Sequence, residues 1–223
     1  MSIPNKRCKW YRGDFHAHSC YSDGTFEPKA LIELEKKENL DFFTITDHNT
    51  MEDFKEFDQN LDVLIIPGIE ITSWKGHFNV FGASNLENGQ QERLGMPYTF
   101  VFASELSREA ILAGVRKRHV YISKGPTIEI SASINEQNYV MGDDLGILER
   151  DLLFKINTHS LTTPYSVKVT RNGVVIFEKH TNKSQLGFDH YERLQKNQSG
   201  WIRVDIFDVK GERVLLTNPF FFA

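Results

Sequence analysis

The sequence predicts an α/β domain followed by an all-β sandwich, and three observations lead to this prediction. Over roughly the first 80 residues, short apolar runs alternate with helical patterns, which is typical of strands joined by helices. From about residue 126 the runs alternate between polar and apolar residues and are separated by turn signals. Residues 84–97 are polar, contain glycine and resemble a linker. We therefore expect an α/β domain at 1–125, shortened near this linker, and a β-sandwich domain at 126–223.

The overall composition is that of an ordinary globular protein. Of the 223 residues, 40% are hydrophobic and 25% are charged, and the net charge of −4 disfavours nucleic acid as the main partner. Two cysteines provide no disulfide framework. The sequence has neither the apolar segment of a signal peptide nor an apolar run of about 18 residues. We therefore expect no membrane partner and predict a cytoplasmic protein.

The first domain is expected to begin with a strand in KWYRGDFHAH, residues 9–18. Pro28 then opens a helix over 28–40, because proline suits the first turn of a helix. The apolar face of this helix is predicted to contain Ala30, Leu31 and Leu34.

Strand and helix signals continue to alternate after this helix. The run DFFTITDH at 41–48 predicts a buried strand, and Thr50 with Asp53 resembles a capping box for a short helix over 51–60. The runs DVLIIPGIEIT and GHFNVFG predict a third and a fourth strand. This alternation favours a parallel sheet or an incomplete barrel.

Local signals also mark the later elements. PYTFVFAS is strand-like, and Ser107 is placed to cap a helix over 108–118, which ends before the strand HVYIS. In the second domain, Asn172 and Gly173 separate SVKVTR from VVIFEK, which is a strong β-hairpin signal.

Potential metal ligands gather near the ends of the predicted strands. His16 and His18 are two positions apart at the end of the first strand, so their imidazoles face the same side. Other candidate ligands lie at the carboxyl-terminal edge of the predicted sheet. They are Asp23 in the next loop, His48 and Glu70 at the ends of the second and third strands, and His77 at the start of the fourth. Ligands of parallel α/β sheets bind at this carboxyl-terminal edge. Converging imidazoles and carboxylates are typical of a divalent metal site.

The segments DFHAHSCYSDG, TITDHNT, IPGIEIT and GHFN occur in this order along the chain. They resemble the successive motifs of the PHP (polymerase and histidinol phosphatase) superfamily of metallohydrolases. YTFVFASELSREAILAGVRKRHVYISKGP and GWIRVDIFD resemble its CehA/McbA-like branch, which is related to carbaryl hydrolase and adds a C-terminal β-sandwich.

The resemblance implies a PHP-type distorted (β/α)7 barrel that holds one to three divalent ions of zinc, manganese or iron. Carried over by position, it implies a first ion at His16 and His18. Glu70 would bridge this ion to a second one, held also by His77. A third ion would bind Asp23 and His48.

The chain departs from the PHP pattern after the fourth motif. The family continues with another histidine and a late Asp-x-His, whereas the only Asp-x-His here is Asp14-Phe15-His16, within the first motif. Only about a dozen residues separate GHFNVFG from LGMPYTFVFAS. We therefore expect a truncated barrel that lacks its middle and late parts. Its open sheet edges would favour a homo-oligomer.

The sequence thus predicts a divalent-metal-dependent hydrolase of small molecules, with phosphoesters as the leading substrate class. His16, His18, Glu70 and His77 are the expected catalytic residues. Two alternatives stay open. The branch resemblance favours a carbamate or amide ester hydrolase of the same fold. The missing late Asp-x-His favours a non-catalytic protein that binds only a metal or a partner.

Overall fold

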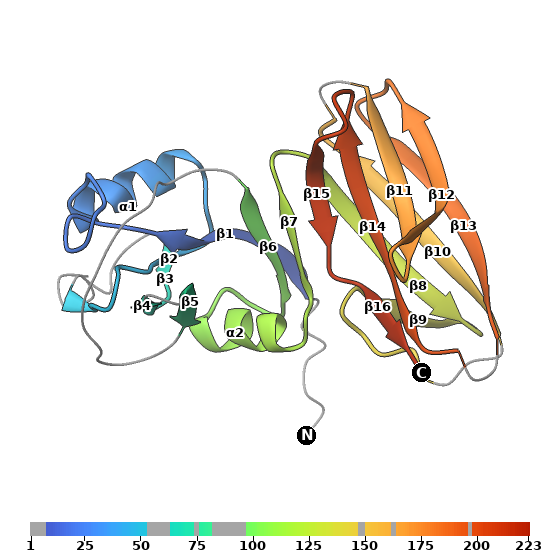
Figure 1. The fold of residues 1–223 in the computed structure, drawn as a ribbon, viewed down its shortest axis with the longest axis horizontal. Helices are drawn as coiled ribbons and strands as arrows, with labels where there is room; N and C mark the ends of the chain where they lie inside the picture. Colours follow the sequence, from blue (N-terminus) through green and yellow to red (C-terminus); the bar gives the residue numbers. More distant parts are fainter. Residues whose placement is uncertain are drawn as a thin grey trace. The chain divides into compact units, whose positions relative to one another are not determined.

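The computed structural model describes residues 8–52, 63–73, 76–81, 97–146, 150–161, 164–195 and 198–223. The chain divides into two compact units, Met1–Gly114 and Val115–Ala223 (Figure 1). The division lies before the expected boundary at residue 125, because β7 (Val120–Ser123) pairs with β15 (Arg213–Thr217) of the second unit. The expected helix at 51–60 and linker at 84–97 fall almost entirely outside the described residues.

The first unit contains an open sheet with the strand order β6-β1-β2-β3. The strands are β1 (Lys9–Ala17), β2 (Phe42–Ile45), β3 (Leu64–Ile65) and β6 (Tyr98–Ala103). β1, β2 and β3 are parallel, whereas β6 is antiparallel to β1. The described residues form two α-helices and no closed barrel, so the (β/α)7 barrel of the predicted fold class is not confirmed.

A separate antiparallel ribbon consists of β4 (Gly68–Ser73) and β5 (Gly76–Phe81). The run DVLIIPGIEIT, predicted as one strand, is broken between β3 and β4 at Pro67. Proline has no N–H to donate to a neighbouring strand, so pairing with β2 cannot continue through it. The third and fourth predicted strands therefore form a hairpin beside the parallel sheet.

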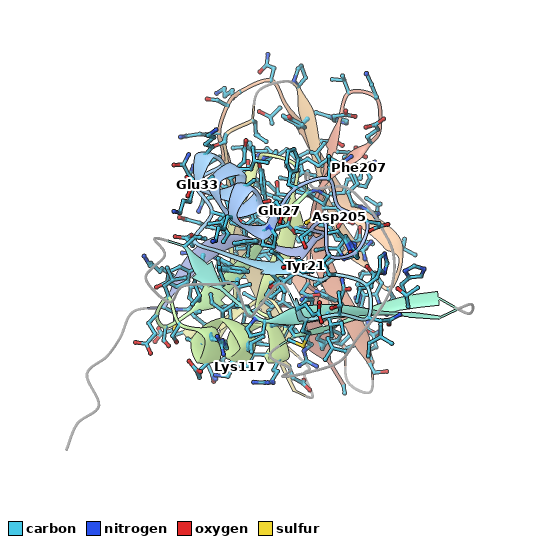
Figure 2. All side chains as sticks on the ribbon, turned by 90° about the vertical axis from the view of Figure 1, so that its left-hand side faces the viewer. Tyr21, Glu27, Glu33, Lys117, Asp205 and Phe207 are labelled. Carbon is cyan, nitrogen blue, oxygen red and sulfur yellow. The ribbon has the colours of Figure 1, made fainter. Side chains whose placement is uncertain are left out.

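The helix α1 (Pro28–Lys37) has proline in its first turn, as predicted. Its predicted apolar face is partly wrong, because Ala30 is exposed while Ile32 and Glu35 are buried. The exposed side carries Glu33 (Figure 2). Its carboxylate pairs with Nζ of Lys36 at 2.9 Å. The buried side joins a core formed by Ala17, Leu31, Ile32, Leu40, Phe43, Ile45 and Val63.

The helix α2 (Arg108–Arg116) confirms the predicted cap. The Ser107 hydroxyl accepts a hydrogen bond from the backbone N–H of Ala110 at 3.2 Å. The helix ends two residues earlier than predicted, and Arg118 adopts a left-handed conformation with φ 64°. Neither of the described helices has the length and apolar character needed to cross a membrane.

The described residues of the second unit form antiparallel strands in two sheets. One has the order β12-β11-β14-β15-β7 with β16 also paired to β14, and the other has the order β13-β10-β8-β9. The remaining strands are β8 (Thr127–Ile134), β9 (Gln137–Val140), β10 (Arg150–His159), β11 (Tyr165–Arg171), β12 (Val174–Thr181), β13 (Leu186–Leu194), β14 (Gly200–Asp208) and β16 (Phe220–Phe222).

The two sheets of this unit contact each other through buried aromatic rings. Phe154 of β10 and Phe220 of β16 have ring centroids 5.3 Å apart. The predicted hairpin is confirmed, because β11 and β12 pair directly on either side of Asn172 and Gly173. Both turn residues have positive φ, at 48° and 85°, as the commonest two-residue hairpin turn requires.

Candidate metal centre

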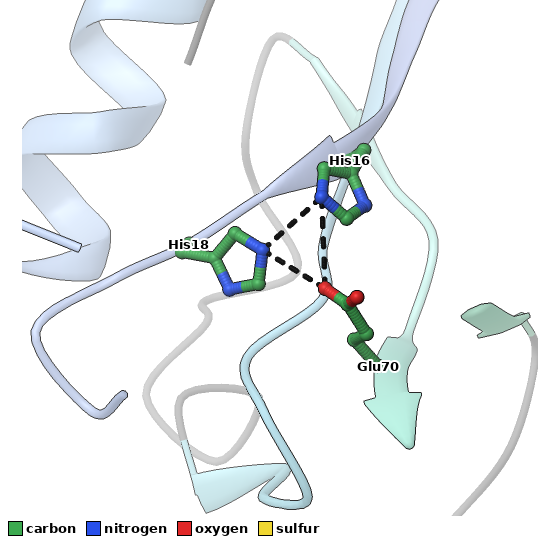
Figure 3. A group of neighbouring side chains, drawn as sticks. All are labelled: His16, His18 and Glu70. Atoms are coloured by element: carbon green, nitrogen blue, oxygen red, sulfur yellow. Dashed lines mark hydrogen bonds and ion pairs between the residues drawn. The ribbon is translucent and has the colours of Figure 1, made fainter. Parts of the chain in front are cut away.

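Strand β1 brings two imidazoles to one point. His16 lies near the end of β1, and His18 follows the strand directly. Their Nε2 atoms are 3.3 Å apart, and Oε2 of Glu70 lies 3.2 Å from that of His18 and 3.6 Å from that of His16 (Figure 3). Ligands of tetrahedral zinc, bound at about 2.0–2.2 Å, lie about 3.4 Å from one another. The triangle therefore has the edge lengths of a metal site.

The segment after β2 places His48 beside Glu70, three residues beyond the strand end at Ile45 rather than at the end itself, where the sequence prediction put it. The backbone N–H of Glu70 donates to the Asp47 carbonyl at 3.2 Å, and that of Asn49 donates to the Glu70 carbonyl at 2.9 Å. Asn49 is left-handed, with φ 50°, and its side chain makes hydrogen bonds of 2.8 and 3.2 Å to the backbone of Thr72. These bonds fix His48 next to the β4–β5 ribbon.

The β4–β5 ribbon supplies a set of polar side chains from one face. Glu70 lies opposite Asn79 and Thr72 opposite His77, so the four alternate positions share a side. Nδ1 of His77 is 2.8 Å from Oε1 of Glu70, and the Thr72 hydroxyl lies 2.5 Å from Nδ1 of His48. Glu70 is thus within β4 rather than at its carboxyl end, where the sequence places it.

Asp47 holds the loop that carries Asp23. The Asp47 side chain is fully buried and accepts hydrogen bonds from the Ser19 backbone N–H at 2.7 Å, the Ser19 hydroxyl, and the Ser22 hydroxyl at 2.5 Å. Gly24 allows the loop to fold tightly, because a Cβ at this position would collide with the His18 carbonyl.

This loop places Asp23 between two imidazoles. Its Oδ1 lies 3.8 Å from Nδ1 of His18 and 3.9 Å from Nε2 of His48. Both carboxylate oxygens of Asp23 and Nε2 of His48 are buried without a hydrogen-bond partner, as is Oε2 of Glu70. Buried polar atoms are almost always paired, so these atoms are suited to a bound cation.

The six predicted ligands lie together in three groups of possible metal ligands, each with atoms within 4.8 Å of one another. The groups are His16, His18 and Glu70; His18, Asp23 and His48; and His48, Glu70 and His77. His18, Asp23, His48 and Glu70 are buried, whereas the side chains of His16 and His77 are 42% and 50% exposed. The cluster is therefore accessible to solvent near His16 and His77.

The environment of the two buried imidazoles, His18 and His48, favours their neutral form. Burial, together with the neighbouring His16, His48 and His77, lowers the pKa of His18 to about 3. Burial also lowers the pKa of His48 and raises the pKa of the Asp23 carboxyl. Neutral imidazoles keep the lone pair that a metal requires. The donor set therefore fits divalent cations that accept nitrogen and oxygen ligands.

Sequence reasoning did not identify the residues that support this cluster. Asp47, Asn49, Thr72 and Asn79 all lie inside the quoted motifs, directly next to or two positions from a predicted ligand. For Thr72 and Asn79, the two-residue period of a strand was an available signal, because it puts them on the same face as Glu70 and His77.

Residues 14–213 match the family model of the PHP domain. The chain belongs to the PHP family. A crystal structure from Bacteroides vulgatus, of a two-domain protein containing a predicted PHP-like metal-dependent phosphoesterase, resembles it with a TM-score of 0.51. That resemblance covers 99% of this chain and 97% of the other. Because the sequence identity is only 15%, the resemblance shows a shared fold and not a shared function. No curated protein matches the chain. The PHP match extends over both units.

Proposed function

We propose that this PHP protein is a divalent-metal-dependent hydrolase whose substrates are phosphoesters. The triangle of His16, His18 and Glu70 carries the proposal, because its edges of 3.2–3.6 Å match those of a metal site. His48, Asp23 and His77 extend the cluster. The PHP family membership supports the same chemistry at a coarse level.

A divalent ion in this cluster would supply an activated water at neutral pH, by lowering the pKa of bound water to about 7. The protein's part is to hold and orient the ligands. His16 and His18 present Nε2, and Glu70 presents one carboxylate oxygen to them and the other to Nδ1 of His77. The half-exposed His77 lies where a substrate can approach. We propose these four as the catalytic residues and zinc, manganese or iron as the metal.

The finer family assignment rests on the sequence motifs. We propose that the chain is a shortened member of the CehA/McbA-like branch. β5 ends at Phe81 and β6 begins at Tyr98, so about 16 residues of sequence connect the ribbon to the next strand, where the family pattern has further β/α units.

The test compares the hydrolysis of an aryl phosphate and an aryl carbamate by protein reconstituted with zinc or manganese. We expect the wild type and the control variant Glu129→Gln, on the exposed face of β8, to release the aryl group from the phosphate. Glu70→Gln should lower the rate at least about 100-fold, since it removes the carboxylate that belongs to two of the three groups of possible ligands. Turnover of the carbamate alone would support the amide and carbamate alternative. Bound metal without either activity would support a binding protein.

A further inference from the structure

The second unit carries a groove of about 730 Å³ that the proposed function does not use. Strands β11, β12 and β14 and the turn between β14 and β15 supply residues that line it. The candidate metal ligands, in contrast, all belong to the first unit. A groove of this volume has the size of a site for a small molecule. The side chains that line it indicate what kind of molecule it suits.

The groove lies on the outer face of its sheet. Side chains alternate along a strand, so the fully buried Val167 and the groove-lining Ser166 and Lys168 are on opposite faces of β11. Ser166 lies opposite His180 of β12 and opposite Phe207 of β14. Three neighbouring strands thus present a continuous row of side chains, His180, Ser166 and Phe207, along the groove.

Glu178 is at the centre of a polar cluster in the groove. Its Oε1 lies 3.3 Å from Nζ of Lys168 and 3.6 Å from Nε2 of His180. Desolvation raises the pKa of the Glu178 carboxyl, but hydrogen bonds from Lys168 and Ser166 outweigh this effect, so the pKa is lowered overall. Glu178 is therefore an ionised hydrogen-bond acceptor, and it compensates the charge of Lys168.

Asp208 adds a second carboxylate to the groove, on a turn that hydrogen bonds hold in shape. Its Oδ1 accepts hydrogen bonds from the backbone N–H groups of Lys210 at 2.8 Å and Glu212 at 2.9 Å. Asn182 contributes a side-chain amide. Glu178 and Asp208 outnumber the single lysine of the lining, so the groove has no excess of positive charge. This balance disfavours an anionic ligand such as phosphate.

Phe207 gives the groove an apolar surface among these polar groups. Its ring is only partly buried, and Nζ of Lys168 and Cζ of Arg213 lie 4.8 and 5.2 Å from the ring centroid. These cation–π contacts help to hold the ring in place. A ligand that fits must therefore combine an apolar surface with groups that both donate and accept hydrogen bonds.

We infer that this groove binds a neutral polyhydroxylated molecule of the size of a mono- or disaccharide. The C–H face of a sugar ring suits the side chain of Phe207. Sugar hydroxyls can donate hydrogen bonds to Glu178 and Asp208, and they can accept them from Lys168 and Asn182. The inference goes beyond the proposed function, because it needs no metal and concerns the other unit of the chain.

The test is saturation-transfer NMR on the metal-free chain, with the methyl glycosides of glucose, galactose, mannose, xylose and N-acetylglucosamine as probes. The wild type should bind at least one of these glycosides. Glu178→Gln should weaken this binding at least about tenfold, because a neutral amide replaces an ionised acceptor. Glu129→Gln, on the exposed face of a strand in the other sheet, is the matched control and should bind as the wild type does.

His180→Ala is a second variant, and it keeps the test decisive even if Glu178→Gln does not fold. The His180 side chain is 79% exposed, so its removal should leave the fold intact. We expect it to weaken glycoside binding by about 3- to 10-fold. Both variants should keep the metal content and the phosphoester hydrolysis of the wild type, so the outcome for the proposed function is read separately.

Saturation transfer to none of the five glycosides would overturn the inference. Unchanged glycoside affinity in both variants would overturn it too, since the ligand would then bind elsewhere. Binding of inorganic phosphate that is lost in His180→Ala, without binding of any glycoside, would assign the groove to an anion instead. A wild type that binds a glycoside but no metal would contradict the proposed function and leave this inference intact.

Discussion

The amide nitrogen Nδ2 of Asn79 lies 2.6 Å from Nδ1 of His16. Oδ1 of the same amide is buried and has no hydrogen-bond partner. If the amide were turned by half a turn, Oδ1 would accept the Nδ1–H of His16, and the lone pair of Nε2 would be directed toward Glu70. The amide of Asn79 would thus select the tautomer of His16 that binds a metal.

Replacing Asn79 by alanine should weaken the tightest metal-binding step by about 10- to 100-fold, because the orientation of His16 is no longer fixed. Competition with a chromophoric chelator measures this affinity. Asn138→Ala is a matched control, since Asn138 lies on an exposed strand of the second unit. Equal affinities of Asn79→Ala and the control would contradict the role of Asn79.

The sequence predicted features that are encoded locally. The Ser107 cap and the turn at Asn172 and Gly173 are confirmed, because each depends on residues close in sequence. The antiparallel β4–β5 ribbon was not predicted. An apolar run fits a parallel or an antiparallel strand equally well, and only the partner decides.

In the candidate site too, the features that depend on nearby residues were predicted, and those that depend on the three-dimensional arrangement were not. The spacing of His16 and His18 and the order of the motifs were sufficient to select the six residues that the structure brings together. The sharing of His18 and His48 between two groups depends on three-dimensional positions. The burial of Glu35 in α1 was missed for a similar reason, since a charged residue on an otherwise apolar face is usually predicted to be exposed.

Asp47 should contribute to stability through the loop it holds. Asp47→Ala leaves the Ser19 and Ser22 hydroxyls and the Ser19 N–H without their acceptor, so we expect a loss of about 2–4 kcal/mol in the free energy of unfolding. Urea unfolding of metal-free protein measures this loss. The exposed Asp189→Ala is the control. A loss no larger than that of the control would show that the loop does not depend on Asp47.

Glu35 should make stability decrease as the pH rises. Burial, with Asp14 and Glu38 nearby, raises its pKa from 4.5 to about 7 in the folded protein. Between these values the folded protein keeps a proton that the unfolded chain has lost. The contribution of Glu35 is therefore fully present below pH 4.5 and is lost as the pH rises through 7.

Glu35→Gln should remove this dependence and stabilise the protein at pH 8 by about 1 kcal/mol, because it removes a charge that is desolvated by burial and repelled by Asp14, with part of the effect screened by solvent. Urea midpoints at pH 5, 6, 7 and 8, with a chelator present, measure the effect. Glu33→Gln is the matched control, because Glu33 lies on the exposed side of the same helix. Parallel pH profiles for Glu35→Gln and the wild type would rule out a buried, protonated Glu35.

The metal content of the purified protein tests the central claim most directly. It is measured by elemental analysis of protein prepared without a chelating tag, beside a His16→Ala/His18→Ala double variant. We expect at least one equivalent of zinc, manganese or iron per chain in the wild type. The double variant should lose the ion of the first group, because two of its three ligands are gone. If the wild type stays metal-free after incubation with excess metal, the cluster is not a metal centre and the proposed hydrolase is wrong.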